Sequence, residues 1–224
     1  MKKLIALVAA AVLSASAVFA ENTFHIGAYF PISPLTVSDE DDVDYDFSSM
    51  SFGGGFDFTH VADGGFTFKV GMGLAYASSD DVEGWASGDA LGGFDFDLGF
   101  GLGGSFIHNE RMTLSLTGNF GLRVQDLYET ESYDFKVAEV DVDTDFFSLL
   151  FYIGPEISYT FRFNDHIGLF ANFGIFYNFG ISDYSVDAEI NGKSLEDFTG
   201  KKYGKDFFTT GFNFQPKIGL AVTL

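Results

Sequence analysis

The amino-acid sequence predicts an all-β protein, an eight-stranded antiparallel β-barrel that spans a membrane. Three observations lead to this prediction. Apolar and polar residues alternate with a period of two in eight segments, which indicates strands with two different faces. The connections between these segments are alternately short and long. The first and last segments lie at the two ends of the expected mature chain, where they can pair and close a ring.

The first twenty residues have the pattern of a secretory signal peptide. Two lysines follow Met1, an apolar stretch runs from Leu4 to Val12, and small residues lead to Ala20. We therefore expect a signal peptide over residues 1–20 and a barrel domain over residues 21–224. No later segment has eighteen uninterrupted apolar residues, and there is no cysteine, so neither a membrane-spanning helix nor a disulfide framework is expected.

The first four strands are predicted at residues 23–32, 51–58, 66–76 and 94–103. Each has phenylalanine, leucine or other apolar residues in one phase and mostly small or polar residues in the other. The fourth segment shows this most clearly, because five apolar residues from Phe94 to Leu102 alternate with Asp95, Asp97 and three glycines. Such a one-sided apolar stripe is unusual for a soluble sheet.

The other four strands are predicted at residues 112–124, 147–162, 167–179 and 208–224. The sixth places Glu156, Ser158, Thr160 and Arg162 in its polar phase. Each of the eight segments has roughly the nine to eleven residues that a tilted strand needs to cross the hydrocarbon core.

The connections predict two different rims. Short turns are expected at residues 60–64, 108–111 and 164–165. The long connections, 33–47, 78–89, 125–145 and 181–206, hold six, four, eight and six of the 32 acidic residues. An even strand number with this alternation is typical of outer-membrane barrels. Alternation before Asn191-Gly192, a strong turn pair, predicts that strands seven and eight extend beyond the bilayer; a ten-strand count is the alternative.

Alternation alone does not decide which phase faces inward, so a soluble lipocalin-like barrel with an apolar pocket is the alternative fold. Its outer face should be richly charged. The polar phase here is glycine, serine, threonine and a few charged residues, which suits a narrow lumen better than a solvent-exposed coat. The sequence therefore favours apolar residues toward lipid and polar residues inside.

The signal peptide, the eight strands and a last strand with Ile218, Leu220, Val222 and Leu224 in its apolar phase resemble small outer-membrane barrels of the OmpX, OmpW and opacity-protein type. The resemblance covers the whole mature chain as a pattern rather than a motif. Many such proteins end in phenylalanine, whereas this chain ends in Leu224. The resemblance implies contact with outer-membrane lipid and insertion by the barrel-assembly machinery.

A set of charged residues is predicted to face the lumen. Asp95 and Asp97 point the same way, roughly 7 Å apart by strand geometry. Paired carboxylates can perform acid–base chemistry, but salt bridges with Lys69, Arg123 or Lys217 are the alternative. The predicted lumen charge network is Asp57, Lys69, Asp95, Asp97, Arg123, Glu156, Arg162 and Lys217. Its nearly balanced charge could plug a narrow barrel as readily as line a pore.

The remaining candidates for chemistry carry weaker signals. Only His25 is on a lumen phase, while His60, His108 and His166 lie in or beside short turns. No active-site pattern of the known outer-membrane acyltransferases, deacylases or omptin proteases is matched. The run Asp39, Glu40, Asp41 and Asp42 offers oxygen ligands for calcium or magnesium, as do Asp141, Asp143 and Asp145, but neither has the glycine and final glutamate of an EF-hand.

Two features of the long connections complete the candidates. Lys193, Lys201, Lys202 and Lys205 form a basic patch in the last one, which could pair with the acidic loops. Trp85, the only tryptophan, is a candidate binding anchor or an interfacial contact with the membrane.

Charge limits the possible functions. Without the signal peptide, 32 acidic and 10 basic residues remain, which argues against nucleic-acid binding. No cofactor is expected. The first hypothesis is a non-enzymatic surface barrel whose acidic loops bind an extracellular ligand or a host partner. The second is a narrow channel for small or apolar solutes, as in OmpW-like proteins, and the third is an outer-membrane enzyme.

Overall fold

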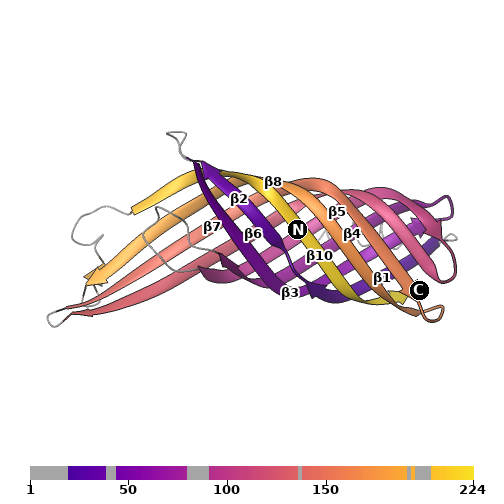
Figure 1. Ribbon diagram of the computed structural model, residues 1–224, viewed down its shortest axis with the longest axis horizontal. Helices are drawn as coiled ribbons and strands as arrows, with labels where there is room; N and C mark the ends of the chain where they lie inside the picture. Colours follow the sequence, from indigo (N-terminus) through magenta and orange to yellow (C-terminus); the bar gives the residue numbers. More distant parts are fainter. Residues whose placement is uncertain (1–19, 39–43, 80–90, 136–137, 191–192, 195–202) are drawn as a thin grey trace, which may run out of the picture.

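The computed structural model describes residues 20–38, 44–79, 91–135, 138–190, 193–194 and 203–224, and this part of the chain is β-structure joined by turns (Figure 1). No helix among these residues has the length and apolar character needed to span a membrane. The strands are β1 (Ala20–Tyr29), β2 (Ile32–Ser38), β3 (Asp44–Ala62), β4 (Phe66–Ser79), β5 (Gly92–His108), β6 (Met112–Phe135), β7 (Ala138–Arg162), β8 (Ile167–Ile190), β9 (Lys193–Ser194) and β10 (Tyr203–Thr223).

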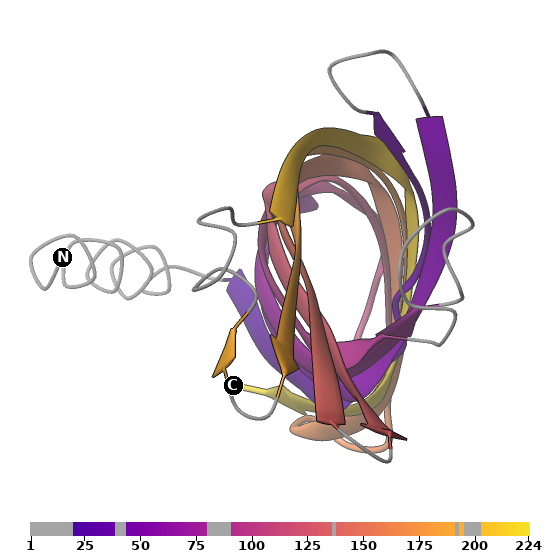
Figure 2. The same ribbon diagram turned by 90° about the vertical axis from the view of Figure 1, so that its left-hand side faces the viewer.

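These ten segments form a closed ring of eight strands. β1 and β2 both pair with β3 on one side and β10 on the other, without a change of register, so they are two parts of one strand. The interruption lies at Pro31, which has no N–H to donate. β9 is a two-residue extension that pairs with β8. The eight-strand prediction is therefore confirmed, and Figure 2 shows the ring along its axis.

The strands at the long-connection end are longer than predicted. β6 and β7 stay paired as far as Phe135 and Ala138, so most of the predicted loop 125–145 is a two-stranded extension. β2 and β3 likewise extend into the predicted loop 33–47. Alternating residues such as Val140 and Val142 continue the period of the strands. The extended β6, β7 and β8 project at the left of Figure 1.

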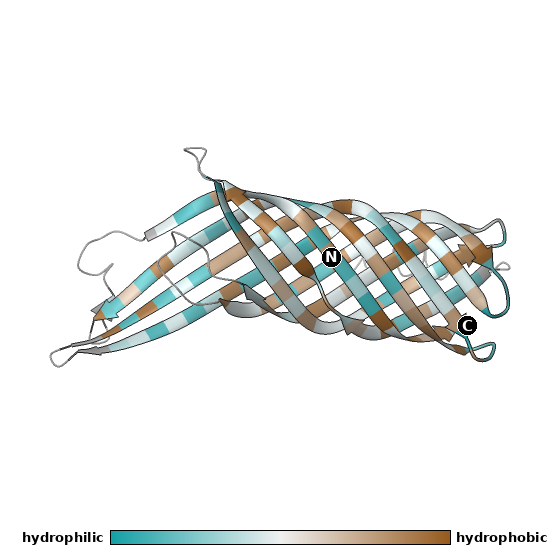
Figure 3. Ribbon diagram, in the orientation of Figure 1, coloured by the Kyte–Doolittle hydropathy of each residue, from teal (hydrophilic) through white to brown (hydrophobic). Residues whose placement is uncertain are grey.

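The barrel is apolar outside and polar inside. Large apolar side chains on the outer face are exposed, for example Phe52 at 64% and Ile153 at 59%. Serine, threonine, asparagine and charged side chains of the opposite phase are buried in the lumen. Figure 3 shows the resulting alternation of brown and teal along the strands. This polarity is the reverse of that in a soluble lipocalin-like barrel and is that of a membrane-spanning one.

One part of the interior differs from the predicted polar lumen. At the end of the long connections, inward-facing apolar side chains form a buried cluster, called here the interior apolar cluster. Its members are Leu35, Val37, Phe47, Ala77, Leu91, Leu127, Phe146, Leu150 and Phe207. Eight of these nine residues lie outside the predicted strand segments, four of them in the predicted loops 33–47 and 125–145, so the sequence pattern assigned them no inward direction.

Candidate functional site in the barrel lumen

The first group of lumen charges brings together four strands. Lys217 of β10 donates to Asp57 of β3, with 3.0 Å between Nζ and Oδ1. Lys69 of β4 lies 3.1 Å from the other oxygen of Asp57 and also forms an ion pair with Glu156 of β7. Asn172 of β8 donates a further hydrogen bond to Asp57 at 3.0 Å. All of these side chains are buried, so each charge has the partner that burial requires.

The second group lies nearer the interior apolar cluster. Arg123 of β6 binds Asp95 of β5 in a bidentate manner, with Nε 2.8 Å from Oδ1 and Nη2 bound to Oδ2. Its Nη1 donates to Ser33, and Ser51 donates to Asp95 at 2.7 Å. A planar guanidinium matches a carboxylate in this way, and both side chains are completely buried. Register makes them diagonal neighbours on adjacent strands, which the sequence pattern could suggest but not select.

The predicted network is divided, because Arg162 does not join the other charges. It lies at the short-turn rim, where it pairs with Glu21 and donates to the Asn109 carbonyl and to Thr113 at 3.2 Å. His108 lies 3.8 Å from the same Glu21 carboxylate. Sequence reasoning did not select Glu21, which stands at the first position of the expected mature chain.

Asp95 and Asp97 do not act as a matched pair. Both oxygens of Asp95 are held by Arg123 and Ser51. Asp97 has no ion pair among the described residues; Tyr152 donates to its Oδ2 at 2.9 Å, and its Oδ1 has no hydrogen-bond partner. The predicted salt bridge is thus found for Asp95 and not for Asp97.

The charged layer leaves almost no free space. A cavity of about 10 Å³ lies between Asp57, Lys69, Asp97, Glu156 and Lys217. This volume is about that of one water-sized probe. The middle of the lumen is therefore filled by side chains, as expected for a barrel of eight strands.

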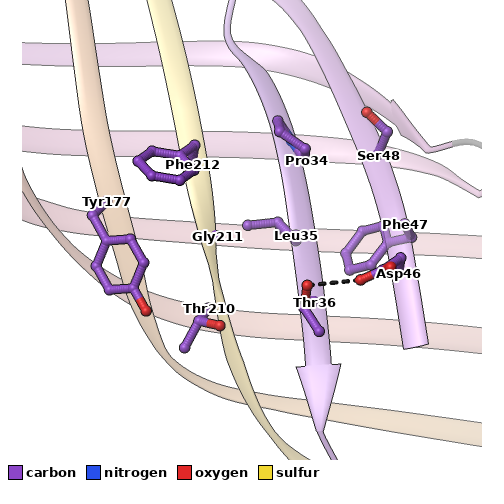
Figure 4. Close-up of a pocket in the computed structure, with 10 residues that line it drawn as sticks. All are labelled: Pro34, Leu35, Thr36, Asp46, Phe47, Ser48, Tyr177, Thr210, Gly211 and Phe212. Carbon is purple, nitrogen blue, oxygen red and sulfur yellow. Dashed lines mark hydrogen bonds between the residues drawn. The ribbon is translucent and has the colours of Figure 1, made fainter. Parts of the chain in front are cut away.

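A groove of about 700 Å³ crosses the outer wall where β2, β3, β8 and β10 meet (Figure 4). β2 and β10 pair from Ser38 to Leu35 and again at Ile32, so Pro34 lies in a gap of the ladder. Gly211, which pairs with Leu35 at the edge of this gap, has a φ of 152°, and a Cβ there would lie 2.3 Å from the Pro34 carbonyl oxygen. Leu35 and Phe47 line the groove and also belong to the interior apolar cluster.

No family model matches the sequence, and no curated protein matches it. Solved structures do. OprG of Pseudomonas aeruginosa, an outer-membrane protein, superimposes with a TM-score of 0.63 at 11% identity, over 92% of this chain and 96% of that one. The chain folds as a small outer-membrane β-barrel. A major outer-membrane protein of Thermus thermophilus has a TM-score of 0.45 at 13% identity, over 91% of this chain and 99% of its own. The outer-membrane protease OmpT of Escherichia coli has a TM-score of 0.41 at 9% identity, over 93% of this chain and 98% of its own.

The histidines of this β-barrel make local contacts. His25 lies in the lumen, with Nε2 3.0 Å from the Thr160 hydroxyl and its ring against Phe170. His60 contacts the Asn22 side chain at 2.9 Å, and His166 contacts the Thr223 carbonyl oxygen at 3.2 Å. These contacts fix the ends and the short-turn rim of the barrel.

Several predicted candidates lie outside the described residues. These are the proposed metal ligands Asp39, Glu40, Asp41 and Asp42, together with Trp85, Lys201 and Lys202. Asp141, Asp143 and Asp145 are described and share the outer face of β7. Within the described part of the barrel, no group of three or more histidine or acidic side chains is arranged to bind a metal ion.

Proposed function

We propose that this protein is exported, inserts into a bacterial outer membrane and acts by binding cationic partners at its long-connection end. Three observations support the location: the signal-peptide pattern, the exposed apolar outer face and the likeness in fold to an outer-membrane protein. The filled middle of the lumen argues against a role as an open aqueous pore.

The proposal that the protein binds cationic partners rests on carboxylates that stand opposite each other on the extended strands. On the outer face of β7, β8 and β10, three acidic pairs stand directly opposite each other across neighbouring strands. They are Asp141 with Glu189, Asp143 with Asp187, and Asp183 with Asp206. Like charges in directly opposed positions destabilise a sheet. Thr130 donates a hydrogen bond to Asp143 and Ser194 donates one to Asp187, each at 2.7 Å. Fold stability therefore does not account for the other two pairs, whereas a bound cationic surface would relieve their repulsion.

The test uses the refolded mature barrel and an oligolysine peptide as the cationic probe. The double substitution Asp141→Asn and Asp183→Asn removes one carboxylate from two of the pairs. We expect it to weaken peptide binding several-fold, to reduce the salt dependence of binding, and to leave resistance to urea equal or higher because repulsion is lost.

The matched control is the double substitution Asp63→Asn and Asp165→Asn, which removes two exposed carboxylates at the opposite, short-turn rim. It should leave binding unchanged. Equal loss of affinity in both double variants would show that only net charge matters and would contradict a defined surface.

Location can be tested separately. The mature barrel should migrate differently before and after heating in gel electrophoresis, and protease added to intact cells should cut near the long-connection end. Recovery of the protein only from the soluble periplasmic fraction would refute the proposed membrane location.

The wall groove supports a second candidate, the passage of small apolar molecules between the barrel interior and the bilayer. Leu35 and Phe47 connect the groove with the interior apolar cluster, and the ladder gap at Pro34 weakens the wall at that point. Such a route would bypass the charged layer that fills the middle of the lumen.

This candidate predicts that Pro34→Val, which restores a backbone N–H to β2, strengthens the wall and lowers uptake of an apolar fluorescent dye by cells that express the barrel. Pro155→Val is the control, because Pro155 also faces outward but lies on β7, away from the groove. Unchanged uptake in the Pro34 variant, with equal amounts of folded barrel, would count against the wall route.

A further inference from the structure

The hydrogen bonds of Asp97 are unequally divided between its two oxygens. Its side chain is deep in the lumen, with 1% of the residue exposed. Tyr152 donates to Oδ2 at 2.9 Å and Gln215 lies 3.5 Å from the same oxygen, whereas Oδ1 has no partner among the described residues. An ionised carboxylate accepts equally well at both oxygens, so this asymmetry is informative.

The neighbouring buried carboxylates show the opposite arrangement. Asp57 accepts from Lys217 at Oδ1 and from Lys69 and Asn172 at Oδ2. Asp95 accepts from Arg123 at both oxygens. Each of them has an ion pair and bonds at both oxygens. Asp97 has no ion pair among the described residues and bonds at one oxygen only, although Arg123 stands opposite it on β6 and Lys217 lines the same small cavity.

The number of charges in the middle of the lumen also sets Asp97 apart from the other carboxylates. The four buried carboxylates are Asp57, Asp95, Asp97 and Glu156, and the three buried cations are Lys69, Arg123 and Lys217. The fourth cation of the predicted network, Arg162, pairs with Glu21 at the short-turn rim. With the buried His25 imidazole counted as neutral, the cations are one fewer than the carboxylates, and the carboxylate without an ion pair among the described residues is Asp97.

We propose that Asp97 is a binding site for one proton in the folded barrel at neutral pH. Oδ1 carries the proton, and Oδ2 is the carbonyl oxygen that accepts from Tyr152. A buried carboxylate without a counter-ion is far costlier than a neutral acid, and ionisable groups at membrane depth are candidate functional sites. This assignment explains both the unequal hydrogen bonds and the missing charge, and it does not depend on the proposed surface binding.

The space beside Oδ1 accommodates such a proton. Gly73 lies beneath both Asp97 and Tyr29, and a Cβ on Gly73 would be 2.7 Å from Oδ1 and 2.5 Å from the Tyr29 ring. The Tyr29 hydroxyl is also buried without a hydrogen-bond partner among the described residues, and it is not bonded to Oδ1. The titratable or charged groups that surround the site are Tyr29 on β1, Asp57 on β3, Lys69 on β4, Asp95 on β5, Arg123 on β6, Tyr152 and Glu156 on β7, and Lys217 on β10.

Infrared spectroscopy of the refolded mature barrel in lipid vesicles tests the proposal directly. With ¹³C-labelled aspartate, the wild type at neutral pH should show the C=O stretching band of a protonated carboxyl, which lies apart from the carboxylate bands. Asp97→Asn should lose this band, and Asp63→Asn, at the exposed rim, should keep it. No protonated band in the wild type, or a band that persists in Asp97→Asn, would overturn the proposal.

Unfolding provides a second measurement. An unfolded chain releases the proton at neutral pH, so the folded barrel binds more protons and its stability should fall as pH rises. Asp97→Asn should flatten this dependence. If that variant does not refold, alkaline titration of the wild type decides the matter, since the protonated band should disappear as the site loses its proton. A band that is absent over the whole range, because a cation or a water molecule stabilises an ionised Asp97, would refute the assignment.

Discussion

At the scale of single residues, buried charged side chains in the lumen are stabilised by ion pairs and hydrogen bonds with one another. Arg123 is completely buried, and its guanidinium is held by Asp95 and Ser33. Removing one member of such a pair leaves a charge that neither water nor a partner stabilises. The pair is therefore costly to break, although its net contribution to stability is modest.

We predict that Arg123→Met lowers the free energy of unfolding by about 3–5 kcal/mol, because Asp95 would be left buried without its counter-ion. Urea titration of the barrel in detergent measures the loss. The double variant Arg123→Met and Asp95→Leu should recover much of it. Arg111→Met at the exposed short-turn rim is the control and should change stability by less than about 0.5 kcal/mol. A similar loss in both single variants would contradict this account.

At the scale of elements, the contact between β1 and β10 closes the barrel and depends on small residues. Gly27 and Gly219 stand opposite each other in this pairing. A Cβ on Gly27 would lie 2.1 Å from the Ile218 carbonyl oxygen, and one on Gly219 would lie 2.2 Å from that of Ile26. Backbone atoms cannot move aside as a flexible side chain can. The pairing of β1 with β10, called here the seam, therefore requires glycine at positions 27 and 219.

The seam predicts different effects for two alanine substitutions on the neighbouring strands β1 and β3. Gly27→Ala should destabilise the barrel by about 1–3 kcal/mol through overpacking and should slow the appearance of the folded band in gel electrophoresis. Gly54→Ala should have little effect, because a Cβ there would meet no atom within 4 Å. Equal refolding of both variants would show that the seam relaxes at little cost.

At the scale of the whole molecule, the barrel consists of an apolar outer face, a charged layer in mid-lumen and the interior apolar cluster toward the long connections. The two inner layers lie in series along the axis. Passage through the lumen would have to displace both, and the cavity within the charged layer is only about 10 Å³.

We therefore predict that the refolded wild-type barrel shows no steady unitary currents in planar lipid bilayers. The triple variant Lys69→Ala, Glu156→Ala and Phe146→Ala removes an ion pair from the charged layer and a ring from the interior apolar cluster without changing the net charge, and it should produce measurable openings. Glu110→Ala with Arg111→Ala, a charge-neutral change at the exposed rim, is the control. Reproducible wild-type currents would contradict the filled lumen.

The sequence by itself determined the strand count, the two faces and the two rims. Period-two alternation is a local property, so residues such as Phe94 and Asp95 show opposite faces without any knowledge of their neighbours. It also placed Asp57, Lys69, Asp95, Asp97, Arg123, Glu156 and Lys217 on inward phases. Residues near the strand ends, such as Phe47 and Leu127, fall in predicted loops because acidic residues interrupt the alternating pattern there.

Only the tertiary structure decided which charges meet. Pairing across the lumen depends on register and barrel closure, which join residues 160 positions apart, such as Asp57 and Lys217. The same closure separated Arg162 from the network, left Asp97 without an ion pair among the described residues and brought Pro34 of β2 opposite β10 beside Gly211. Alternation specifies the direction of a side chain, but only the closed ring specifies the side chain that it faces.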